Sequence, residues 1–441
     1  MPLGLIALAA GGFGIGLTEF VILGLLPEVA SDFNVSIPVA GYLVSVYALS
    51  VAFGGIFVTA VAAGRNPKNT LALLMVLFIT GNLISALSPD YTVMLIGRIV
   101  AALCHGAFFG VGAVLAANLV EPHRKAAAVS IMFAGLTTAN VLGVPFGTFL
   151  GQNFGWRSTF WAITGIGIIA LIGMLAFIRT QPANQPANLR LELSAFTNVQ
   201  VWLSILVTVF GFGAMFGAFT YITPMLTQVA GFPETAVPWM LVLFGVGLFA
   251  GNIFGGQAAD RNLDKSLLVL LCALAVILFS FTVALETQWT AAIALFLLGV
   301  FGFAAVPGMQ VRVLHFAQEA PTLASGVNIS AFNVGNALGA HLGGITITAG
   351  MGYASPTWVG GCLAITAIIF MVSSIQRLKS RGARHGNLKN RLRRARPSQG
   401  NAPLNRAPPW SSRLEADQPV VPGWSASWNQ GRLKPDLVLR S

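Results

Sequence analysis

The sequence predicts an all-α protein that crosses a membrane many times, and three observations support this fold class. Hydrophobic residues make up 55% of the 441 residues and charged residues only 9%, whereas soluble domains carry about 25% charged residues. Apolar stretches recur along the chain, each close to the roughly 20 residues that a helix needs to cross a bilayer. These stretches are continuous rather than alternating, which excludes a transmembrane β-barrel.

The formal net charge of +11 lies entirely in the C-terminal tail. Residues 1–376 contain 11 Lys and Arg and 11 Asp and Glu, whereas residues 377–441 contain 14 basic and 3 acidic residues. Three cysteines are too few for a disulfide framework. A neutral, apolar body excludes a soluble enzyme and a basic DNA-reading domain, so no nucleic-acid partner is expected.

Twelve spans can be placed before residue 377, which leaves about 31 residues for each helix and its connection. They are expected near 4–26, 38–62, 70–87, 93–118, 127–149, 158–178, 202–225, 238–258, 267–285, 291–313, 323–347 and 356–375.

Lys and Arg in the short connections predict the orientation in the membrane. They gather in the even-numbered connections, whereas the odd-numbered connections carry only Arg157. The basic residues of the even-numbered connections are Arg65, Lys68, Arg124, Lys125, Arg179, Arg190, Arg261 and Lys265. Because basic connections stay inside, the even-numbered connections and both termini are expected in the cytoplasm.

The spans divide six and six around a polar linker at residues 179–201. We therefore expect an N-terminal half (1–178), a C-terminal half (202–376) and a basic cytoplasmic tail (377–441). A repeat relates the halves, because AVAAGRNPK, from Ala60, returns as GQAADRNLDK, from Gly256. Six-plus-six halves with matching loops are typical of transporters built from parallel repeats.

The loop after span 8 resembles the loop motif of the major facilitator superfamily, which reads Gly, three residues, Asp-Arg and a downstream basic residue. In that family the loop latches the cytoplasmic ends of helices together. The first copy departs from the pattern, with Ala60 in place of Gly and Gly64 in place of Asp. Without a latching role, both loops would be positive-inside anchors. The loop candidates are Arg65, Lys68, Gly256, Asp260, Arg261 and Lys265.

Three further stretches resemble the twelve-span drug:H⁺ antiporter branch of this superfamily, and more closely its sugar-efflux and chloramphenicol-efflux relatives. They are GLTEFVILGLLPEVASDF (Gly16–Phe33), GRIVAALCHGAFFGVGAVLAANL (Gly97–Leu119) and GLTTANVLGVPFGTFLGQNFGWRSTFW (Gly135–Trp161). The resemblance covers about residues 5–376. It implies two six-helix halves around a central cavity, a place in a bacterial inner membrane, and a monomer that exchanges a small molecule for protons.

Glu19 is the clearest ionisable candidate, because it lies inside span 1 among apolar neighbours. Burial disfavours the charged form of a carboxyl, so this group could bind and release a proton near neutral pH. Near the outer boundary of the membrane it would instead be a solvated surface residue.

Arg98 lies five residues into span 4 and must find a partner or extend to the membrane surface. The resemblance implies the fourth-helix Arg associated with proton coupling, whose charge would favour the ionised form of a nearby acid. His105 is a weaker candidate, for which a hydrogen-bonded packing role is the alternative. Further polar candidates for a cavity or for bridges between helices are Asn140, Gln310, Asn333 and Asn336.

Small residues recur in span 5 at spacings of mostly four, which lets helices approach closely. They are Gly135, Gly143, Gly147 and Gly151, with Pro145 among them. Pro145 removes a backbone donor and favours a kink. The resemblance implies that this helix supports exchange.

The sequence carries no Walker loop, no dinucleotide fingerprint and no carboxylate cluster for a metal. No cofactor or metal site is expected, and transport would be driven by a proton gradient.

Nine of the 20 residues from Arg377 onward are basic and none is acidic, which favours anionic lipid headgroups as partners of the tail. Arg312, at the end of span 10, is expected to be an anchor at the inner surface.

These features favour a secondary transporter, most simply a proton-coupled exporter of a small amphipathic drug-like or sugar-like compound. One alternative is a proton symporter or facilitator that imports a nutrient. Another is a non-transporting membrane sensor with the same fold, although a sensor has no need for Glu19, Arg98 and the glycine motif of span 5 together.

The orientation generates a first prediction. In a variant without native cysteines, Arg190→Cys and Thr235→Cys should react with a membrane-impermeant thiol reagent from opposite sides, because they occupy an even-numbered and an odd-numbered connection. Labelling is measured in intact cells and in inverted vesicles. Reaction of both positions from the same side would contradict twelve spans with this orientation.

Overall fold

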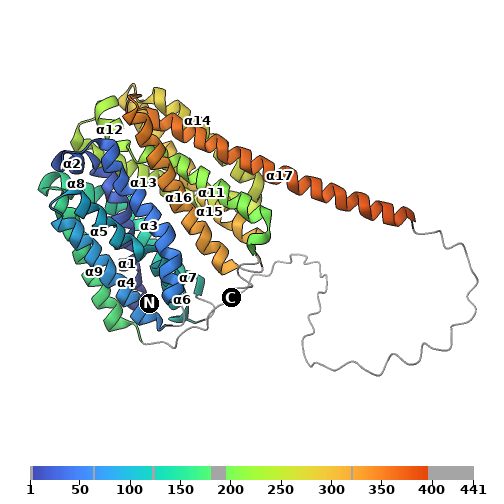
Figure 1. Ribbon diagram of the computed structural model, residues 1–441, viewed down its shortest axis with the longest axis horizontal. Helices are drawn as coiled ribbons and strands as arrows, with labels where there is room; N and C mark the ends of the chain where they lie inside the picture. The colour runs from blue at the N-terminus through green and yellow to red at the C-terminus, as the bar shows by residue number, and fades with distance from the viewer. Residues whose placement is uncertain (1–2, 63–64, 122–124, 180–194, 319–320, 396–441) are drawn as a thin grey trace, which may run out of the picture. The chain divides into compact units, whose positions relative to one another are not determined.

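The computed structural model describes residues 3–62, 65–121, 125–179, 195–318 and 321–395, and every regular element among them is helical (Figure 1). The long helices are α1 (Leu3–Gly24), α3 (Ile37–Ala62), α4 (Pro67–Leu87), α5 (Tyr91–Leu103), α6 (His105–Asn118), α7 (Lys125–Thr138), α8 (Val144–Phe154), α9 (Trp156–Phe177), α11 (Val199–Phe219), α13 (Val237–Arg261), α14 (Leu263–Ala284), α15 (Gln288–Phe316), α16 (Pro321–Thr348) and α17 (Ser355–Ala395). The short elements are α2 (Leu26–Asp32), α12 (Ile222–Pro224), the π-helical turns η2 (Ala139–Gly143) and η4 (Met225–Val229), and the 3₁₀ turns η3 (Ala195–Thr197) and η5 (Glu234–Ala236).

Each of the twelve predicted spans coincides with one of these helices or with consecutive helices, which confirms the all-helical polytopic fold. In the described part of the chain, eleven stretches are long and apolar enough to cross a membrane. The remaining predicted span is α16, which has 28 residues but is rich in Asn, Ser and Gly. Arg124 and Arg190, two of the basic residues that predicted the orientation, lie outside the described residues, as do most of the linker and tail residues 396–441.

Two predicted spans are interrupted. The fourth breaks at Cys104, between α5 and α6, so that His105 begins a new helix. The fifth contains the π-helical turn η2 immediately before Pro145, which occupies the start of α8. A proline withholds one backbone donor, and a π-helical turn is one way in which a helix accommodates the disturbance.

The repeated Arg-Asn pair of the two loops has a local structural role. Asn66 caps α4 by accepting a hydrogen bond from the backbone N–H of Lys68 at 3.0 Å. Asn262 caps α14 in the same way, through the N–H of Lys265 at 3.1 Å. An Asn side chain is well suited to satisfy the free N–H groups of a first helical turn. The sequence repeat therefore begins the third and the ninth spans alike.

Small residues bring α13 and α15 into close contact. A Cβ atom at Gly251 would lie 2.0 Å from the carbonyl oxygen of Val300, and one at Gly255 would lie 1.9 Å from that of Ala304. The glycines are four residues apart, so they share one face of α13 and place its backbone directly against α15.

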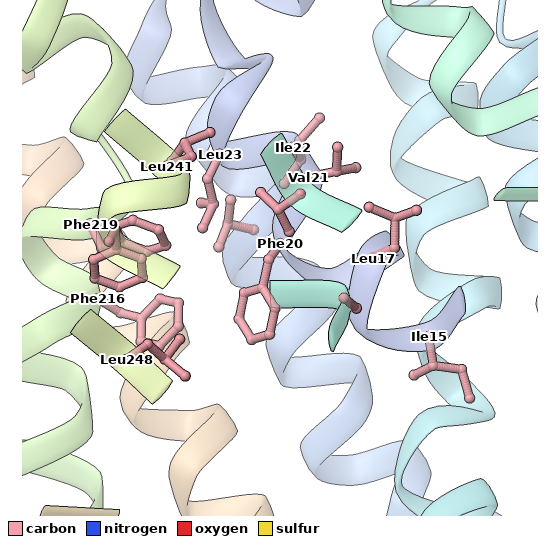
Figure 2. Packing of buried hydrophobic residues seen from close by; sticks show 14 of the residues in the cluster. Ile15, Leu17, Phe20, Val21, Ile22, Leu23, Phe216, Phe219, Leu241 and Leu248 are labelled. Atoms are coloured by element: carbon pink, nitrogen blue, oxygen red, sulfur yellow. The ribbon is translucent and has the colours of Figure 1, made fainter. Parts of the chain in front are cut away.

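Segments 3–179 and 195–381 meet at the end of the molecule that holds α2, which we call the α2 end. The Phe20 ring of α1 stacks on Phe216 of α11, with centroids 5.7 Å apart, and Figure 2 shows Phe20 directed toward Phe216 and Phe219. The hydroxyl of Thr223 donates to the carbonyl of Leu23 at 2.8 Å. These contacts place α1 against α11 and α12.

A second seam joins α3 to α16, which lie side by side in Figure 1. Ser45 donates to the carbonyl of Ala337 at 3.3 Å, and Ser330 donates to that of Ala52 at 2.9 Å. Hydroxyls that bond to carbonyls across two helices satisfy their own polar groups without water, as a membrane interior requires.

The tight face of α13 generates a prediction. Gly251→Ala should lower the free energy of unfolding by ~1–3 kcal/mol, because the new methyl group meets the Val300 carbonyl oxygen of a rigid helix. Thermal unfolding in detergent measures the effect. Gly165→Ala is the matched control, because a Cβ there meets no atom within 4 Å and alanine favours the helix. Equal melting temperatures for wild type and Gly251→Ala would contradict the prediction.

Candidate functional site

Arg98 lies at the centre of the candidate site and is fully buried. Asp90 caps α5 and Gly97 lets it lie against α4, so the buried face of α5 directs Arg98 toward α1 and α3. The guanidinium donates to the backbone carbonyls of Thr18 and Glu19 on α1 and of Leu43 on α3.

Tyr47 of α3 completes the environment of this cation, because its ring lies 4.1 Å from the guanidinium carbon of Arg98. A cation above an aromatic face is attracted by the negative charge density of the ring, and more strongly when both are desolvated. Arg98 is thus held by backbone carbonyls and a ring, and among the described residues no carboxylate forms a hydrogen bond or ion pair with it.

Three proton-carrying side chains surround Arg98. The Glu19 carboxyl is 8% exposed, and its Oε2 lies 3.9 Å from Nδ1 of His105. The Tyr47 hydroxyl lies 3.4 Å from the same nitrogen. Thr18 donates to Oδ1 of Asn82 at 3.1 Å, which fixes α1 against α4 one residue before Glu19. A carboxyl, an imidazole and a phenol within reach of one another can exchange a proton.

Glu19, Arg98 and His105 were candidates from the sequence, and the structure brings them together in one cluster. Tyr47, Thr18 and Asn82 were not singled out. Their only signal in the sequence is a polar group within an apolar span, and the same signal marks many residues that merely bond to their own helix.

Two other candidates lie elsewhere. Asn140, on η2, donates to the carbonyl of Leu136 one turn earlier. Gln310 bridges α15 and α16, because it donates to the Ser325 hydroxyl at 2.8 Å and accepts from Asn328 at 2.7 Å. Neither forms a hydrogen bond with the Arg98 cluster in the described residues.

Asn333 and Asn336 both lie buried on α16. The side-chain oxygen of each is buried without a hydrogen-bond partner among the described residues.

The glycines of span 5 pack against α1, the helix that carries Glu19. A Cβ at Gly135 would lie 2.0 Å from the carbonyl oxygen of Ala9, and one at Gly147 would lie 2.7 Å from Val21. Gly143 faces Phe13 and Gly151 faces Leu25 in the same way. Pro145 lies buried between these positions.

The loop candidates do not form a single site. Lys68 donates to the carbonyl of Leu175 at 2.8 Å, and Arg65 is exposed. Asp260, Arg261 and Lys265 are exposed as well. A Cβ at Gly256 would meet nothing within 4 Å, so this glycine is not required for close packing.

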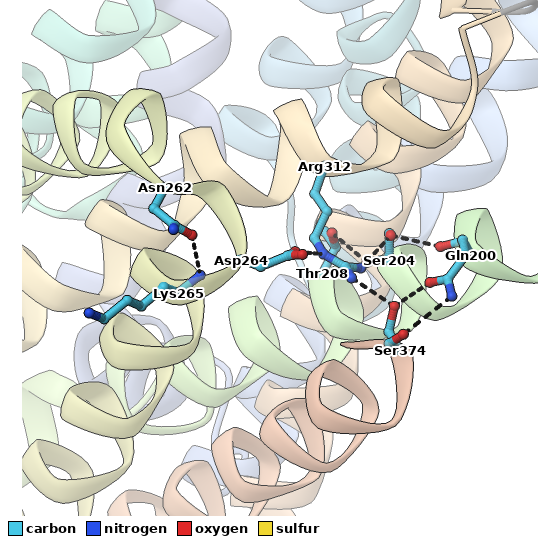
Figure 3. A network of polar contacts seen from close by, with 8 residues as sticks. All are labelled: Gln200, Ser204, Thr208, Asn262, Asp264, Lys265, Arg312 and Ser374. Atoms are coloured by element: carbon cyan, nitrogen blue, oxygen red, sulfur yellow. Dashed lines mark hydrogen bonds and ion pairs between the residues drawn. The ribbon is translucent and has the colours of Figure 1, made fainter. Parts of the chain in front are cut away.

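Arg312 is not an inner-surface anchor, as the sequence suggested, but a fully buried residue. Its guanidinium bonds to Asp264 at 2.8 Å, to the Ser204 hydroxyl at 2.6 Å and to the Ser374 hydroxyl at 2.7 Å (Figure 3). Gln200 accepts from Ser374 and extends the network. The network joins α11, α14, α15 and α17, and its carboxylate is Asp264 rather than the motif residue Asp260.

Two carboxylates lie at the α2 end. Asp32 accepts from Arg157 at 2.6 Å and from Trp156 at 3.2 Å, and the hydrogen bond from Arg157 lowers the pKa of Asp32 below its usual value. Glu28 accepts from Gln152 at 3.2 Å, and burial raises the pKa of Glu28 above its usual 4.5. The second oxygen of Glu28 is buried without a hydrogen-bond partner among the described residues.

A polytopic helical bundle is an architecture of many membrane transport proteins, and the comparisons place the chain in that class. The family model of the Major Facilitator Superfamily matches residues 8–322 and 231–435. The chain therefore belongs to this superfamily. It is a multi-pass secondary transporter rather than an enzyme.

Named relatives extend over most of the chain. It is 43% identical over 373 residues to the inner membrane transport protein YdhP of Escherichia coli, covering 85% of this chain and 96% of the relative. It is 32% identical over 374 residues to a chloramphenicol resistance protein of Streptomyces lividans, covering 84% and 95% of the two chains. The crystal structure of a D-xylose–proton symporter has the same fold, with a TM-score of 0.65, 16% identity and coverage of 83% and 96%.

The burial of Glu28 generates a prediction for the pH dependence of stability. Because the folded protein holds the Glu28 proton more tightly than the unfolded chain, this contribution is complete below pH 4.5 and is lost as pH rises through the raised pKa. The melting temperature of Glu28→Gln should therefore fall less than that of wild type between pH 4.5 and pH 8.

Glu286→Gln is the control for this measurement, because Glu286 is an exposed carboxylate. The control should keep the pH dependence of wild type. Equal falls in the melting temperatures of wild type and Glu28→Gln between pH 4.5 and pH 8 would contradict the prediction.

Proposed function

We propose that this chain is a proton-coupled exporter of a small amphipathic compound in a bacterial inner membrane. The observation that carries the proposal is the buried cluster around Arg98, in which Glu19, His105 and Tyr47 lie within reach of one another. Ionisable side chains inside a membrane are costly and are typical of proton pathways.

The direction of transport and the substrate class rest on a relative. The Streptomyces lividans protein, 32% identical, is named for chloramphenicol resistance. Export of the drug is the simplest way in which a secondary transporter confers resistance. The even-numbered connections are expected in the cytoplasm. Because α2 lies in the first connection, the α2 end is expected to face outward.

Proton coupling requires a group whose affinity for the proton differs between two conformations. The Arg98 charge acts on the Glu19 carboxylate, and the Arg98 guanidinium is held to the backbone of the same helix. A movement of α1 relative to α5 would change the distance between these charges. Protonation of Glu19 and opening of the α2 end are then linked through one helix.

Alternating access follows from the contacts at the α2 end. Phe20 lies next to Glu19 in the sequence, and its ring stacks on Phe216 of the other segment. The closed α2 end and the protonation site thus share two consecutive residues of α1. Opening this end requires separation of the two rings, which displaces the backbone that carries Glu19.

The test is Glu19→Gln, which keeps the shape and hydrogen bonding of the side chain but cannot titrate. In proteoliposomes, addition of chloramphenicol should release protons from wild type and should not do so from the variant. Gradient-driven export should be lost, whereas downhill exchange should remain. Glu286→Gln, at an exposed carboxylate, should behave as wild type.

Proton release and concentrative export by Glu19→Gln at wild-type levels would show that Glu19 is structural. The coupling residue would then have to be sought at His105, at Asp260, or at His341, an exposed histidine of α16. Wild type that neither binds nor moves chloramphenicol, in the presence of a proton gradient, would contradict export of this compound.

A further inference from the structure

Three buried amide oxygens on α16, those of Asn328, Asn333 and Asn336, lack hydrogen-bond partners in the described residues. Asn336 is 2% exposed and Asn333 is 7% exposed, and the Oδ1 atom of each is buried and unpaired. Nδ2 of Asn333 donates to the carbonyl of Ile329 on its own helix, which leaves only the oxygen without a partner. Buried polar groups in native proteins are nearly always paired, so three such oxygens on one helix call for a functional explanation.

Two of these three side chains, Asn333 and Asn336, lie on one side of the helix. Asn333 and Asn336 are three residues apart and therefore neighbours on adjacent turns. Phe332 precedes Asn336 by four residues and so shares its face. Two acceptors that lie one turn apart can bind two donors of one small molecule.

An aromatic surface continues from these amides toward α1. The ring centroid of Phe332 lies 4.9 Å from that of Phe212, which lies 4.9 Å from that of Phe216. Phe216 in turn stacks on Phe20, the residue after Glu19 (Figure 2). A flat apolar group bound beside the amides would thus lie on rings that reach the helix of the proposed proton site.

The membrane-spanning parts of α11, α13, α14, α15 and α16 supply no charge to this surface. Asp, Glu, Lys and Arg are absent from residues 199–219, 237–259, 266–285, 288–311 and 321–348. An anion would face acceptor oxygens without a cation, and an organic cation would find no carboxylate on these helices. The Glu19 carboxyl of α1 lies at the far end of the surface, beside His105. The part of the surface next to the amides therefore suits a neutral ligand.

We propose that Asn333 and Asn336 form a substrate site for neutral compounds that carry hydroxyl or N–H donors beside a flat apolar group. The assignment rests on the proposed export function and specifies its substrate class. Donors of a bound ligand would satisfy the amide oxygens that the described residues leave unpaired.

Replacement of each Asn by Leu tests the site, because Leu has a similar volume and no acceptor. If the oxygens serve the ligand rather than the fold, Asn336→Leu and Asn333→Leu should unfold at the same or a higher temperature than wild type without ligand. Both should bind chloramphenicol at least tenfold more weakly. This compound is neutral and carries two hydroxyls and an N–H beside an aromatic ring.

Asn328→Leu is the matched control on the same helix. Asn328 is also buried and its oxygen is also unpaired in the described residues, but its amide nitrogen donates to Gln310 of α15 at 2.7 Å and so holds two helices together. This variant should lose stability, because Gln310 loses its donor, and should keep the wild-type affinity for chloramphenicol.

Binding is measured on the purified full chain in detergent with four probes: chloramphenicol, its O-acetylated derivative, tetraphenylphosphonium and benzoate. Wild type should bind chloramphenicol, and the acetylated form at least tenfold more weakly because its hydroxyl donors are blocked. Equal affinity of wild type and both Asn variants, equal affinity for the acetylated form, preference for the cation or the anion, or binding of none of the probes would each overturn the assignment.

The two proposals fail in different ways. Asn variants that bind chloramphenicol as wild type does, in a protein that still releases protons on its addition, remove this site and leave the exporter standing. Loss of proton-coupled transport in Glu19→Gln with chloramphenicol binding intact supports both proposals.

Discussion

The burial of the Arg98 guanidinium is the constraint on which the first segment of the structure depends. A permanently charged group inside a membrane must find all its hydrogen-bond partners within the protein. Arg98 finds them on two other helices, at the carbonyls of Thr18, Glu19 and Leu43, and on the ring of Tyr47. Each guanidinium N–H left unpaired would cost about 1–3 kcal/mol or more, so α1, α3 and α5 hold one another in a single arrangement.

That arrangement determines what the rest of the first segment must do. Because α1 is fixed by Arg98 on one side, the fifth span can approach it on the other side only where side chains are absent, as at Gly135 and Gly147. The small residues of this span thus let it pack against the helix that Arg98 holds. Glu19 is exposed to the Arg98 charge because its own backbone carbonyl binds the same guanidinium.

The two buried arginines differ in their partners. Arg312 bonds to one carboxylate and two hydroxyls of fixed side chains on three other helices. The Asp264 side chain is 39% exposed, so water screens this ion pair. The buried hydroxyls of Ser204 and Ser374 complete a network that joins the helices of the second segment. Arg98 is held mainly by backbone, and the carboxyl near it remains available to a proton. Only the environment of Arg98 leaves a nearby carboxyl, that of Glu19, free to change its charge during a transport cycle.

Much of the fold was predictable from the sequence, because span length and hydropathy are imposed by the bilayer itself. The repeated loop was also recognisable, although the reason for its Arg-Asn pair, the caps at Asn66 and Asn262, required the structure. The site was predictable only in its charged members. Tyr47 and Asn82 look like many neutral residues in the spans, and no pattern along the chain tells which of them meet across helices. Asp264 was missed because the motif drew attention to Asp260, which lies four residues earlier at the end of α13.

The buried titratable groups and the unpaired amides lie on different helices. In the described residues, the buried titratable cluster belongs to α1, α3, α5 and α6, whereas the unpaired amides belong to α16. The rings of Phe20, Phe216, Phe212 and Phe332 connect them without a polar contact. Charge does not travel through such a surface, so in the proposed mechanism proton and substrate communicate by displacement of packed rings. Packed aromatic groups resist gradual deformation and favour discrete arrangements, which is the property that alternating access requires.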